Sequence, residues 1–261
     1  VQTAKKTGAK LLPTDSEHNA IFQALHDEPP ERIARLILTA SGGPFRDLPL
    51  DEFEQITLAE SLNHPNWEMG QKITIDSATM MNKGLEIIEA HWLFNTPVEN
   101  IDVLMQRESI IHSMVEFIDG SFLAQMGLPD MRVPIAYCLG WPDRVVAGVA
   151  PLDLVTTGRL DFEAPDMTAF PCLALAKRAI TQPGGMCVFS AANEVAVAAF
   201  LAREIRFTEI DVVIANALEA VTLSEPKSLD AVQTLDKEAR SAAAQAVAQI
   251  ASLNERHEKE Q

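Results

Sequence analysis

Thr14-Asp15-Ser16-Glu17-His18-Asn19 places two carboxylates and a histidine within four residues, directly after the apolar run Leu11-Leu12-Pro13. An apolar run that ends in an acidic segment is typical of the carboxyl end of a strand, where open α/β sheets bind their ligands. In an extended segment alternate side chains point the same way, so Asp15 and Glu17 are expected on one face and Ser16 and His18 on the other. Two carboxylates on one face repel unless a cation lies between them, and such oxygen ligands suit Mg²⁺ or Mn²⁺.

A helix N-terminus explains the same residues without a metal ion, and on this stretch alone it is the favoured interpretation. Asp15 or Ser16 would cap the helix, and Glu17 would offset the helix dipole. The pattern predicts a strand over Lys10–Thr14 and a helix over Glu17–Leu25.

A second, buried strand is predicted over Ala34–Ala40, and it runs into the small loop Ser41-Gly42-Gly43-Pro44. The backbone N–H groups of a glycine-bearing loop can bind an anion. An ordinary turn is the simpler explanation of these four residues.

The composition argues against several classes of partner. The net charge of -16 over 261 residues disfavours a surface for nucleic acid or anionic membrane, so an anionic substrate needs a local positive site. Cys138, Cys172 and Cys187 form no Cys-x-x-Cys pair, and their odd number indicates reduced thiols in the cytoplasm. No apolar run reaches membrane-spanning length, and no signal peptide is visible. We therefore expect a cytoplasmic protein with no nucleic-acid partner and no membrane partner.

The loop His64-Pro65-Asn66-Trp67-Glu68-Met69-Gly70 has an unusual content. Pro65 favours an extended neighbour, and Trp67 and Met69 are large apolar groups in a polar segment. These two side chains either fill the core beneath the loop or belong to a flap that covers a ligand.

A long helix is predicted from Ala78 to about Phe94, capped by Asp76-Ser77. Its apolar stripe consists of Met81, Leu85, Ile88 and Trp92. Another face gathers Asn82, Lys83 and Glu86. An ordinary Lys83–Glu86 pair on a solvated face is the usual explanation; the alternative is a site where Asn82 and Lys83 hold a phosphate and Glu86 is a further metal ligand.

Two more strands are predicted over Ile101–Gln106 and Ile111–Ile118, and Asp119-Gly120 is a strong hairpin signal before Ser121–Gln125. His112 projects from one of these strands, where a structural role is the usual one. A short helix should start at Pro129-Asp130 and end near Leu139.

The domain organisation follows from these patterns. We expect residues 1–9 to be the last helix of a preceding domain, ending at Gly8, and residues 10–140 to form a metal- and substrate-binding domain. A proline-containing linker over 141–170, with short strands around 153–162, precedes a helical bundle over 171–253 and a frayed tail over 254–261. The bundle helices are predicted at 171–181, 191–204, 209–221 and 236–253. The predicted fold class is α+β (α/β-like), with a small mixed sheet followed by a C-terminal α-helical bundle.

Five motifs in this order carry a resemblance to a known family. They are Leu-Leu-Pro-Thr-Asp-Ser-Glu-His-Asn-Ala (11–20), Leu-Thr-Ala-Ser-Gly-Gly-Pro-Phe-Arg (38–46), His-Pro-Asn-Trp-Glu-Met-Gly (64–70), Asp-Ser-Ala-Thr-Met-Met-Asn-Lys-Gly-Leu-Glu (76–86) and Ser-Ile-Ile-His-Ser-Met-Val (109–115). Together with Ala191-Ala-Asn-Glu-Val they closely resemble the 1-deoxy-D-xylulose 5-phosphate reductoisomerase family. That family makes 2-C-methyl-D-erythritol 4-phosphate for isoprenoid synthesis with NADPH and a divalent metal.

The resemblance implies a role for each matching residue. The metal ligands would be Asp15, Glu17 and Glu86, of which Glu17 and Glu86 also belong to the substrate site. The other substrate contacts would be Ser16 at the reacting hydroxyls, and Ser41, Ser77, Asn82 and Lys83 at the phosphate, with His64 nearby. The pocket would also include His18, His112 and the flap residues Trp67 and Met69, and Gly70 would approach the nicotinamide nucleotide. The family also implies a homodimer acting on a small phosphorylated sugar.

The sequence departs from the family pattern at two places. No glycine-rich phosphate loop of a dinucleotide-binding domain is found, so this chain is expected to be the catalytic and C-terminal portion, inactive without that domain. Gln106-Arg107-Glu108 stand where the family usually has His-Pro-Gln before Ser-Ile-Ile-His.

Two other functions fit the same residues. The chain would be a non-catalytic remnant that dimerises or binds a partner, or a metal-dependent sugar-phosphate isomerase or lyase that uses no nucleotide. Retention of the polar site residues argues against the remnant.

Overall fold

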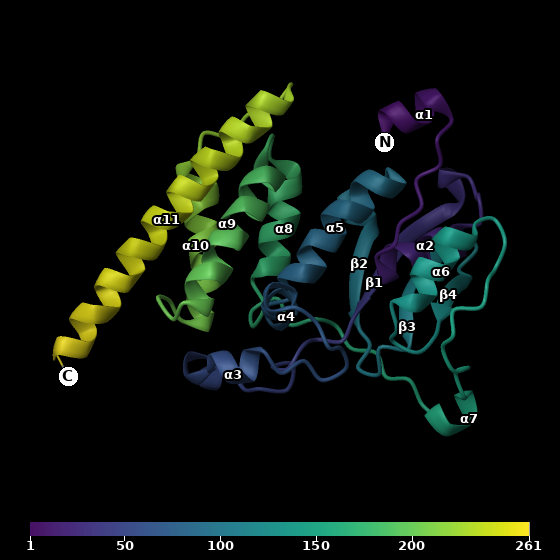
Figure 1. Ribbon diagram of the computed structural model, residues 1–261, viewed down its shortest axis with the longest axis horizontal. Coiled ribbons are helices and arrows are strands. Elements are labelled where there is room, and N and C mark those ends of the chain that lie inside the picture. Colours follow the sequence, from purple (N-terminus) through teal and green to yellow (C-terminus); the bar gives the residue numbers. More distant parts are fainter. Residues whose placement is uncertain (261) are drawn as a thin grey trace. The chain divides into compact units, whose positions relative to one another are not determined.

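The computed structural model describes residues 1–260, and a mixed four-stranded sheet lies at the centre of its first half (Figure 1). The spatial order is β2-β1-β3-β4, where the strands are β1 (Ile33–Ala40), β2 (Ile101–Met105), β3 (Ile111–Phe117) and β4 (Phe122–Met126). β1 pairs in parallel with β2 and antiparallel with β3, and β3 pairs antiparallel with β4. The predicted fold class, a small mixed sheet followed by a helical bundle, is confirmed.

Local sequence signals explain the sheet. β1 is rich in apolar residues, and its last five residues are buried, as expected for a central strand. The β3–β4 hairpin turns at Asp119-Gly120, where Gly120 adopts a φ of 83° that a glycine tolerates. The Asp119 carboxylate accepts a hydrogen bond from the Ser121 N–H at 2.9 Å and so closes the turn.

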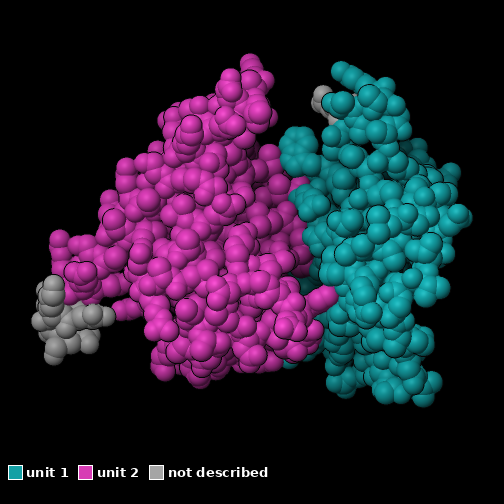
Figure 2. All heavy atoms as spheres, viewed as in Figure 1, with its two compact units in different colours: residues 1–42, 89–165 teal, residues 43–88, 166–261 magenta. Residues whose placement is uncertain are grey.

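The chain forms two compact units, each built from two separate stretches (Figure 2). The first unit comprises residues 1–42 and 89–165 and contains the sheet. Its helices are α1 (Gln2–Thr7), α2 (Ser16–Leu25), η1 (Pro30–Arg32), η3 (Val98–Asn100), α6 (Arg132–Gly140) and α7 (Leu154–Thr157). α2 packs against β3 and β4. Part of the core is formed by Ile37, Ile111 and Met114, against which Leu104 and Leu160 pack.

The second unit comprises residues 43–88 and the chain from residue 166, and it is mainly helical. Its elements are η2 (Leu50–Gln55), α3 (Leu58–Ser61), α4 (Gln71–Ala78), α8 (Cys172–Thr181), α9 (Gly185–Leu201), η4 (Phe207–Glu209), α10 (Ile210–Ala220), α11 (Leu229–Glu260) and the first part of α5 (Met81–Phe94), whose end belongs to the first unit. Helices α9, α10 and α11 pack side by side, with α8 against α9 (Figure 1).

Several sequence-based boundaries were wrong. Lys10–Thr14 forms no strand: Pro13 has no N–H for a ladder, and its carbonyl instead accepts bonds from Asn19 Nδ2 and Cys138 Sγ. The helix expected from Ala78 to Phe94 is broken, because Met80 adopts a φ of 57° between α4 and α5. Asp76 and Ser77 therefore lie inside α4 and do not cap α5.

The remaining differences lie in the C-terminal half. The strands expected around 153–162 are replaced by α7 and by an isolated bridge between Met105 and Glu163. α9 and α11 begin earlier than predicted, and α11 continues through residues 254–260, where the sequence predicts a frayed tail. Gln261 lies outside the described residues. The domain boundaries at 140 and 170 stay predictions, since compactness divides the chain elsewhere. No described helix is long and apolar enough to cross a membrane.

Candidate active site

The start of α2 gathers an acidic cluster, by which we mean Asp15, Glu17, His18 and Glu89. Asp15 occupies the N-cap position but makes no side-chain capping bond, so the simple capping interpretation does not describe its carboxylate. The extended geometry expected for residues 15–18 is also wrong, because the helix begins at Ser16. On a helix, residues three apart share a face, and His18 Nδ1 accordingly lies 3.3 Å from Asp15 Oδ2. Ser16 donates its hydroxyl to Glu17 Oε2 at 2.5 Å.

Glu89, which the sequence-based prediction missed, approaches the same histidine from the end of α5. Its Oε2 lies 3.9 Å from His18 Nδ1, and ligand atoms of Asp15, His18 and Glu89 all lie within 4.8 Å of one another. Burial raises the pKa of the Glu89 carboxyl; His18 lowers that pKa, while Asp15 and Glu17 raise it further. The signal that could have found Glu89 is its position three residues after Glu86.

The sheet of the first unit positions Ser41 and His112. Ser41 follows the last residue of β1, and His112 is the buried second residue of β3. These two strands run antiparallel, so the end of β1 lies beside the start of β3, and Thr39 Oγ1 donates to the Ile111 carbonyl at 2.5 Å. Ser41 and His112 therefore belong to the same end of the sheet.

In the second unit, α5 carries a buried cluster formed by Asn82, Lys83 and Glu86. Lys83 Nζ lies 2.5 Å from Glu86 Oε2, and Asn82 Nδ2 donates to Glu86 Oε1 at 2.5 Å. Lys83 and Glu86 are only 5% and 2% exposed, so the solvated-face interpretation is wrong although the ion pair exists. Burying an ion pair is costly unless its geometry is good, which makes this cluster unusual for a merely structural helix face.

Ser77 lies on α4, the helix that precedes that cluster, next to the buried Asp76. Asp76 forms an ion pair with Lys72 at 2.6 Å, and Asn193 Nδ2 of α9 donates a hydrogen bond to its Oδ1 at 2.9 Å. Burial raises the pKa of Asp76, and Lys72 and Asn193 lower it. A side chain on Gly43 would come within 2.9 Å of the Ser77 carbonyl, so only glycine permits this approach of the Ser41–Pro44 loop.

His64 is locked into one tautomer by its own loop. Its Nδ1 accepts the N–H groups of Asn66 at 3.1 Å and Trp67 at 2.9 Å, which leaves the proton of the neutral ring on Nε2. Burial, with a smaller effect of the Arg46 charge, lowers the pKa of His64 to about 4. The ring is therefore neutral near pH 7 and presents Nε2–H as a donor. Trp67 and Met69 are half-buried, which fits a flap or a plug equally.

Gly70 ends this loop at the N-cap of α4. A Cβ there would meet nothing within 4 Å, so packing within the chain does not require glycine at this position.

Two models of one protein family match most of the chain. A model described as the 1-deoxy-D-xylulose 5-phosphate reductoisomerase C-terminal domain matches residues 11–94, and one described as the DXP reductoisomerase C-terminal domain matches residues 126–242. Together the two models match well over half of the chain.

The chain belongs to the 1-deoxy-D-xylulose 5-phosphate reductoisomerase family.

Sequence identity to curated members of the reductoisomerase family supports this assignment. The chain is 52% identical over 257 residues to the reductoisomerase of Cellvibrio japonicus, covering 95% of this chain and 65% of that protein. It is 51% identical to the one of Pseudomonas paraeruginosa, covering 94% of this chain and 63% of the relative. The chain thus spans a little less than two thirds of the length of these relatives.

Solved structures of the family share the fold. The reductoisomerase of Zymomonas mobilis in complex with NADPH matches with a TM-score of 0.88 and 45% identity, covering 94% of this chain and 63% of that one. A DOX-P reductoisomerase in complex with NADPH, fosmidomycin and magnesium matches with a TM-score of 0.85 and 45% identity, covering 94% and 65%.

The departure from the family pattern at Gln106-Arg107-Glu108 has a structural explanation. Gln106 is fully buried, and its Oε1 accepts the N–H groups of Ile110 at 2.8 Å and Ile111 at 3.2 Å. Arg107 makes two hydrogen bonds with Glu163, at 2.8 and 2.9 Å. The amide and the ion pair therefore fix the loop that precedes His112.

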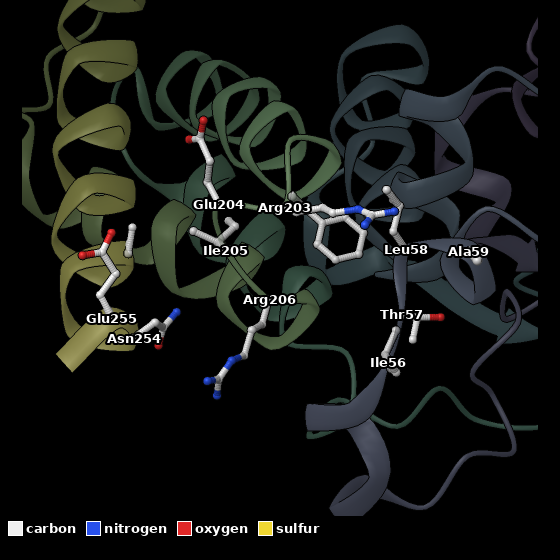
Figure 3. A pocket seen from close by; sticks show the side chains of 12 residues that line it. Ile56, Thr57, Leu58, Ala59, Arg203, Glu204, Ile205, Arg206, Asn254 and Glu255 are labelled. Atoms are coloured by element: carbon white, nitrogen blue, oxygen red, sulfur yellow. The ribbon is translucent and has the colours of Figure 1, made fainter. Parts of the chain in front are cut away.

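A separate hollow in the second unit contains none of the predicted site residues. It has a volume of about 690 Å³, and Figure 3 shows Arg203 extending toward Leu58, and Arg206 lying between Arg203 and the residues Asn254 and Glu255 of α11. Arg206 lies 3.5 Å from Glu54, and Asn254 donates to Glu209 at 2.9 Å. Arg206 and Asn254 therefore bind to other residues of the same unit.

The predicted residues thus divide between the units. The first unit holds Asp15, Ser16, Glu17, His18, Ser41 and His112, and the second holds His64, Trp67, Met69, Gly70, Ser77, Asn82, Lys83 and Glu86. Within its own unit the structure brings together Asp15 with His18, and Asn82 and Lys83 with Glu86.

Proposed function

We propose that this chain is the metal- and substrate-binding portion of a reductoisomerase that converts 1-deoxy-D-xylulose 5-phosphate to 2-C-methyl-D-erythritol 4-phosphate with NADPH. The observation that carries this proposal is the buried cluster on α5, in which a lysine, an amide and a carboxylate are paired inside the protein. Groups of this kind are seldom buried without a role.

The metal ligands in this proposal are Asp15, Glu17 and Glu86. All three offer hard oxygen atoms, which suit Mg²⁺ or Mn²⁺. Asp15 and Glu17 lie close enough to Glu89 to add to the effect of burial, which is the main cause of its raised pKa. Glu86 lies one helical turn before Glu89 on α5, on the same face. A bound divalent cation would supply Lewis-acid stabilisation of the charge that develops on the substrate oxygens.

The phosphate contacts in this proposal are Ser41, Ser77, Asn82, Lys83 and His64. Lys83 supplies the positive charge, and the hydroxyls and the amide supply hydrogen bonds. His64 donates from Nε2, because its Nδ1 is already occupied by two backbone N–H groups. Such a local site binds an anion despite the net charge of -16.

The remaining pocket residues have positioning and shielding roles in this proposal. Ser16 contacts the reacting hydroxyls, and His18 and His112 line the pocket. Trp67 and Met69 close over the substrate and exclude water before hydride transfer, and Gly70 lets the nicotinamide nucleotide approach.

We also infer a cytoplasmic homodimer. The three cysteines are free, as expected for a reducing compartment. β4 is an edge strand of the sheet, and Phe122 and Leu123 on it are about half exposed, which supports pairing with a second copy. Sedimentation analysis tests this: a single monomeric species at micromolar concentration would refute the dimer.

Calorimetry tests the proposed function. The 261-residue chain should bind Mn²⁺, and fosmidomycin should bind only when Mn²⁺ is present. No heat from either ligand would favour the non-catalytic remnant.

Turnover gives a second test. The chain alone should show negligible NADPH-dependent turnover and regain it with the rest of a relative's protein; steady turnover by the chain alone would refute its dependence on a further domain. A rearranged product without NADPH would favour the nucleotide-independent isomerase or lyase.

A further inference from the structure

Three of the proposed phosphate contacts lie on the two sides of a helix break. Ser77 belongs to the last turn of α4, and Asn82 and Lys83 belong to the first turn of α5. A continuous helix turns about 100° per residue, so it would place Asn82 and Lys83 about 120–140° around the axis from Ser77, on the far side. Contacts arranged in that way could not bind one phosphate group. The break is therefore part of any phosphate site that uses all three residues.

The break is a single residue in the left-handed conformation. Met80 has a φ of 57°, which is costly for a residue other than glycine and persists only where the surrounding structure holds it. The Met80 N–H donates to the Ser77 carbonyl at 3.1 Å, and the Met80 carbonyl accepts the N–H of Gly84 at 3.1 Å. Met80 thus connects the end of α4 to the first turn of α5.

Thr79, the residue before the break, connects the same two helices through its hydroxyl. Its Oγ1 donates to the Ile75 carbonyl of α4 at 3.0 Å and accepts the Met81 N–H of α5 at 3.3 Å. The first N–H groups of a helix have no partner within that helix, and here the hydroxyl supplies one for Met81. Thr79 is only 5% exposed, so its hydroxyl has little access to water that could replace these bonds.

Each of the two helices is also packed against a different neighbour. Asn193 of α9 donates to Asp76 of α4 at 2.9 Å. Gly84 of α5 lies so close to α8 that a Cβ on it would come within 2.9 Å of the Ala176 Cβ. These contacts hold α4 and α5 without the Thr79 hydroxyl, so its loss should loosen the break without unfolding the chain.

We infer that Thr79 is a positioning residue for the phosphate group of the substrate. Its hydroxyl holds the break at Met80 in the form in which the contacts on α4 and α5 reach one phosphate. This inference rests on the proposed function, since it needs a phosphate bound by residues of both helices. Thr79 acts through the backbone and does not itself touch the substrate.

Calorimetry of fosmidomycin binding at saturating Mn²⁺ tests this in variants of the 261-residue chain. Thr79→Val keeps the shape and removes the hydroxyl. We expect its fosmidomycin dissociation constant to rise about tenfold, because loss of a hydrogen bond lowers the population with the correct break. Thr79→Ser keeps the hydroxyl and should restore most of the affinity. Thr181→Val is the matched control: it removes a hydroxyl that donates to the Arg178 carbonyl at 2.8 Å at the end of α8, and the affinity should not change.

The two ideas fail in different ways. If the wild-type chain binds no fosmidomycin with Mn²⁺, the proposed function is wrong and the inference fails with it. If the wild type binds it and Thr79→Val binds it equally well, the positioning role is wrong and the proposed function stands. The same follows if Thr79→Ser loses as much affinity as Thr79→Val, or if Thr181→Val loses as much.

Amide hydrogen exchange of the wild type is a second measurement, which does not depend on the folding of any variant. The Met81 N–H should be protected before fosmidomycin is added, because the Thr79 hydroxyl already holds it. Protection that arises only with fosmidomycin would show that the ligand forms the break, and would overturn the inference.

Discussion

The acidic cluster at the start of α2 and the buried cluster on α5 handle charge in opposite ways. The acidic cluster has three carboxylates around one histidine and is partly exposed. The buried cluster pairs Lys83 and Asn82 with Glu86 away from solvent. Under the proposed function the first group binds a divalent cation, whereas the opposite charges of the second already lie together in the folded chain.

This comparison predicts its largest effect for Lys83→Met. The variant leaves Glu86 buried without its cation, and removing one partner of a buried pair costs about 3–5 kcal/mol. The free energy of unfolding in urea measures the loss. Arg206→Met is the control: its pair with Glu54 is about half exposed and should cost under about 1 kcal/mol. Equal losses in the two variants would show that burial of the α5 pair has no special effect.

A smaller effect is expected from metal at the acidic cluster. Mn²⁺ at 100 times its dissociation constant should add about 2.7 kcal/mol to the free energy of unfolding. Asp15→Asn should abolish that gain, measured against the metal-free stability of the same variant. Stabilisation by Mn²⁺ that persists in Asp15→Asn would place the cation elsewhere.

Asn193→Ala should cost about 1–3 kcal/mol, because it removes the hydrogen bond to the buried Asp76 carboxylate. Urea unfolding again measures it. The variant should also weaken fosmidomycin binding, since Asp76 lies next to Ser77 on α4. If the variant is destabilised but binds fosmidomycin with wild-type affinity, Asn193 contributes to packing and not to the substrate site.

The smallest expected effect is a pH dependence from His64. The folded-state pKa is lowered from 6.5 to about 4, so the neutral ring contributes stability above pH 6.5 that is lost as the pH falls toward 4. His64→Asn should therefore lose less stability than the wild type over that interval. His26→Asn, at an exposed loop position, is the control. Parallel curves for the wild type and His64→Asn would contradict the assigned environment.

Local signals predicted much of the fold. The periodicity of residues 17–25, the apolar run of β1 and the Asp119-Gly120 turn each act over a few residues, and α2, β1 and the hairpin formed as predicted. The break at Met80 could not be read in this way, because a positive φ at methionine is imposed by the surrounding structure. The strand expected over Lys10–Thr14 failed for a similar reason: distant Cys138 and nearby Asn19 satisfy the backbone there.

The candidate site was likewise predicted in part. The motifs indicated Asp15, Glu17 and the group Asn82, Lys83 and Glu86 as site residues. Whether that group is solvated or buried depends on tertiary packing, which no motif encodes. Glu89 was missed because an exposed acid on a helix looks like an ordinary surface residue. Its meeting with His18 joins residues far apart in the chain.

The central claim is that Asp15, Glu17 and Glu86 bind one divalent cation. Anomalous scattering from crystals of this chain grown with Mn²⁺ tests it most directly. The account predicts one strong peak at bonding distance from carboxylate oxygens of all three residues. A peak held by Asp15, His18 and Glu89 without Glu86, or no peak near Asp15, would contradict it.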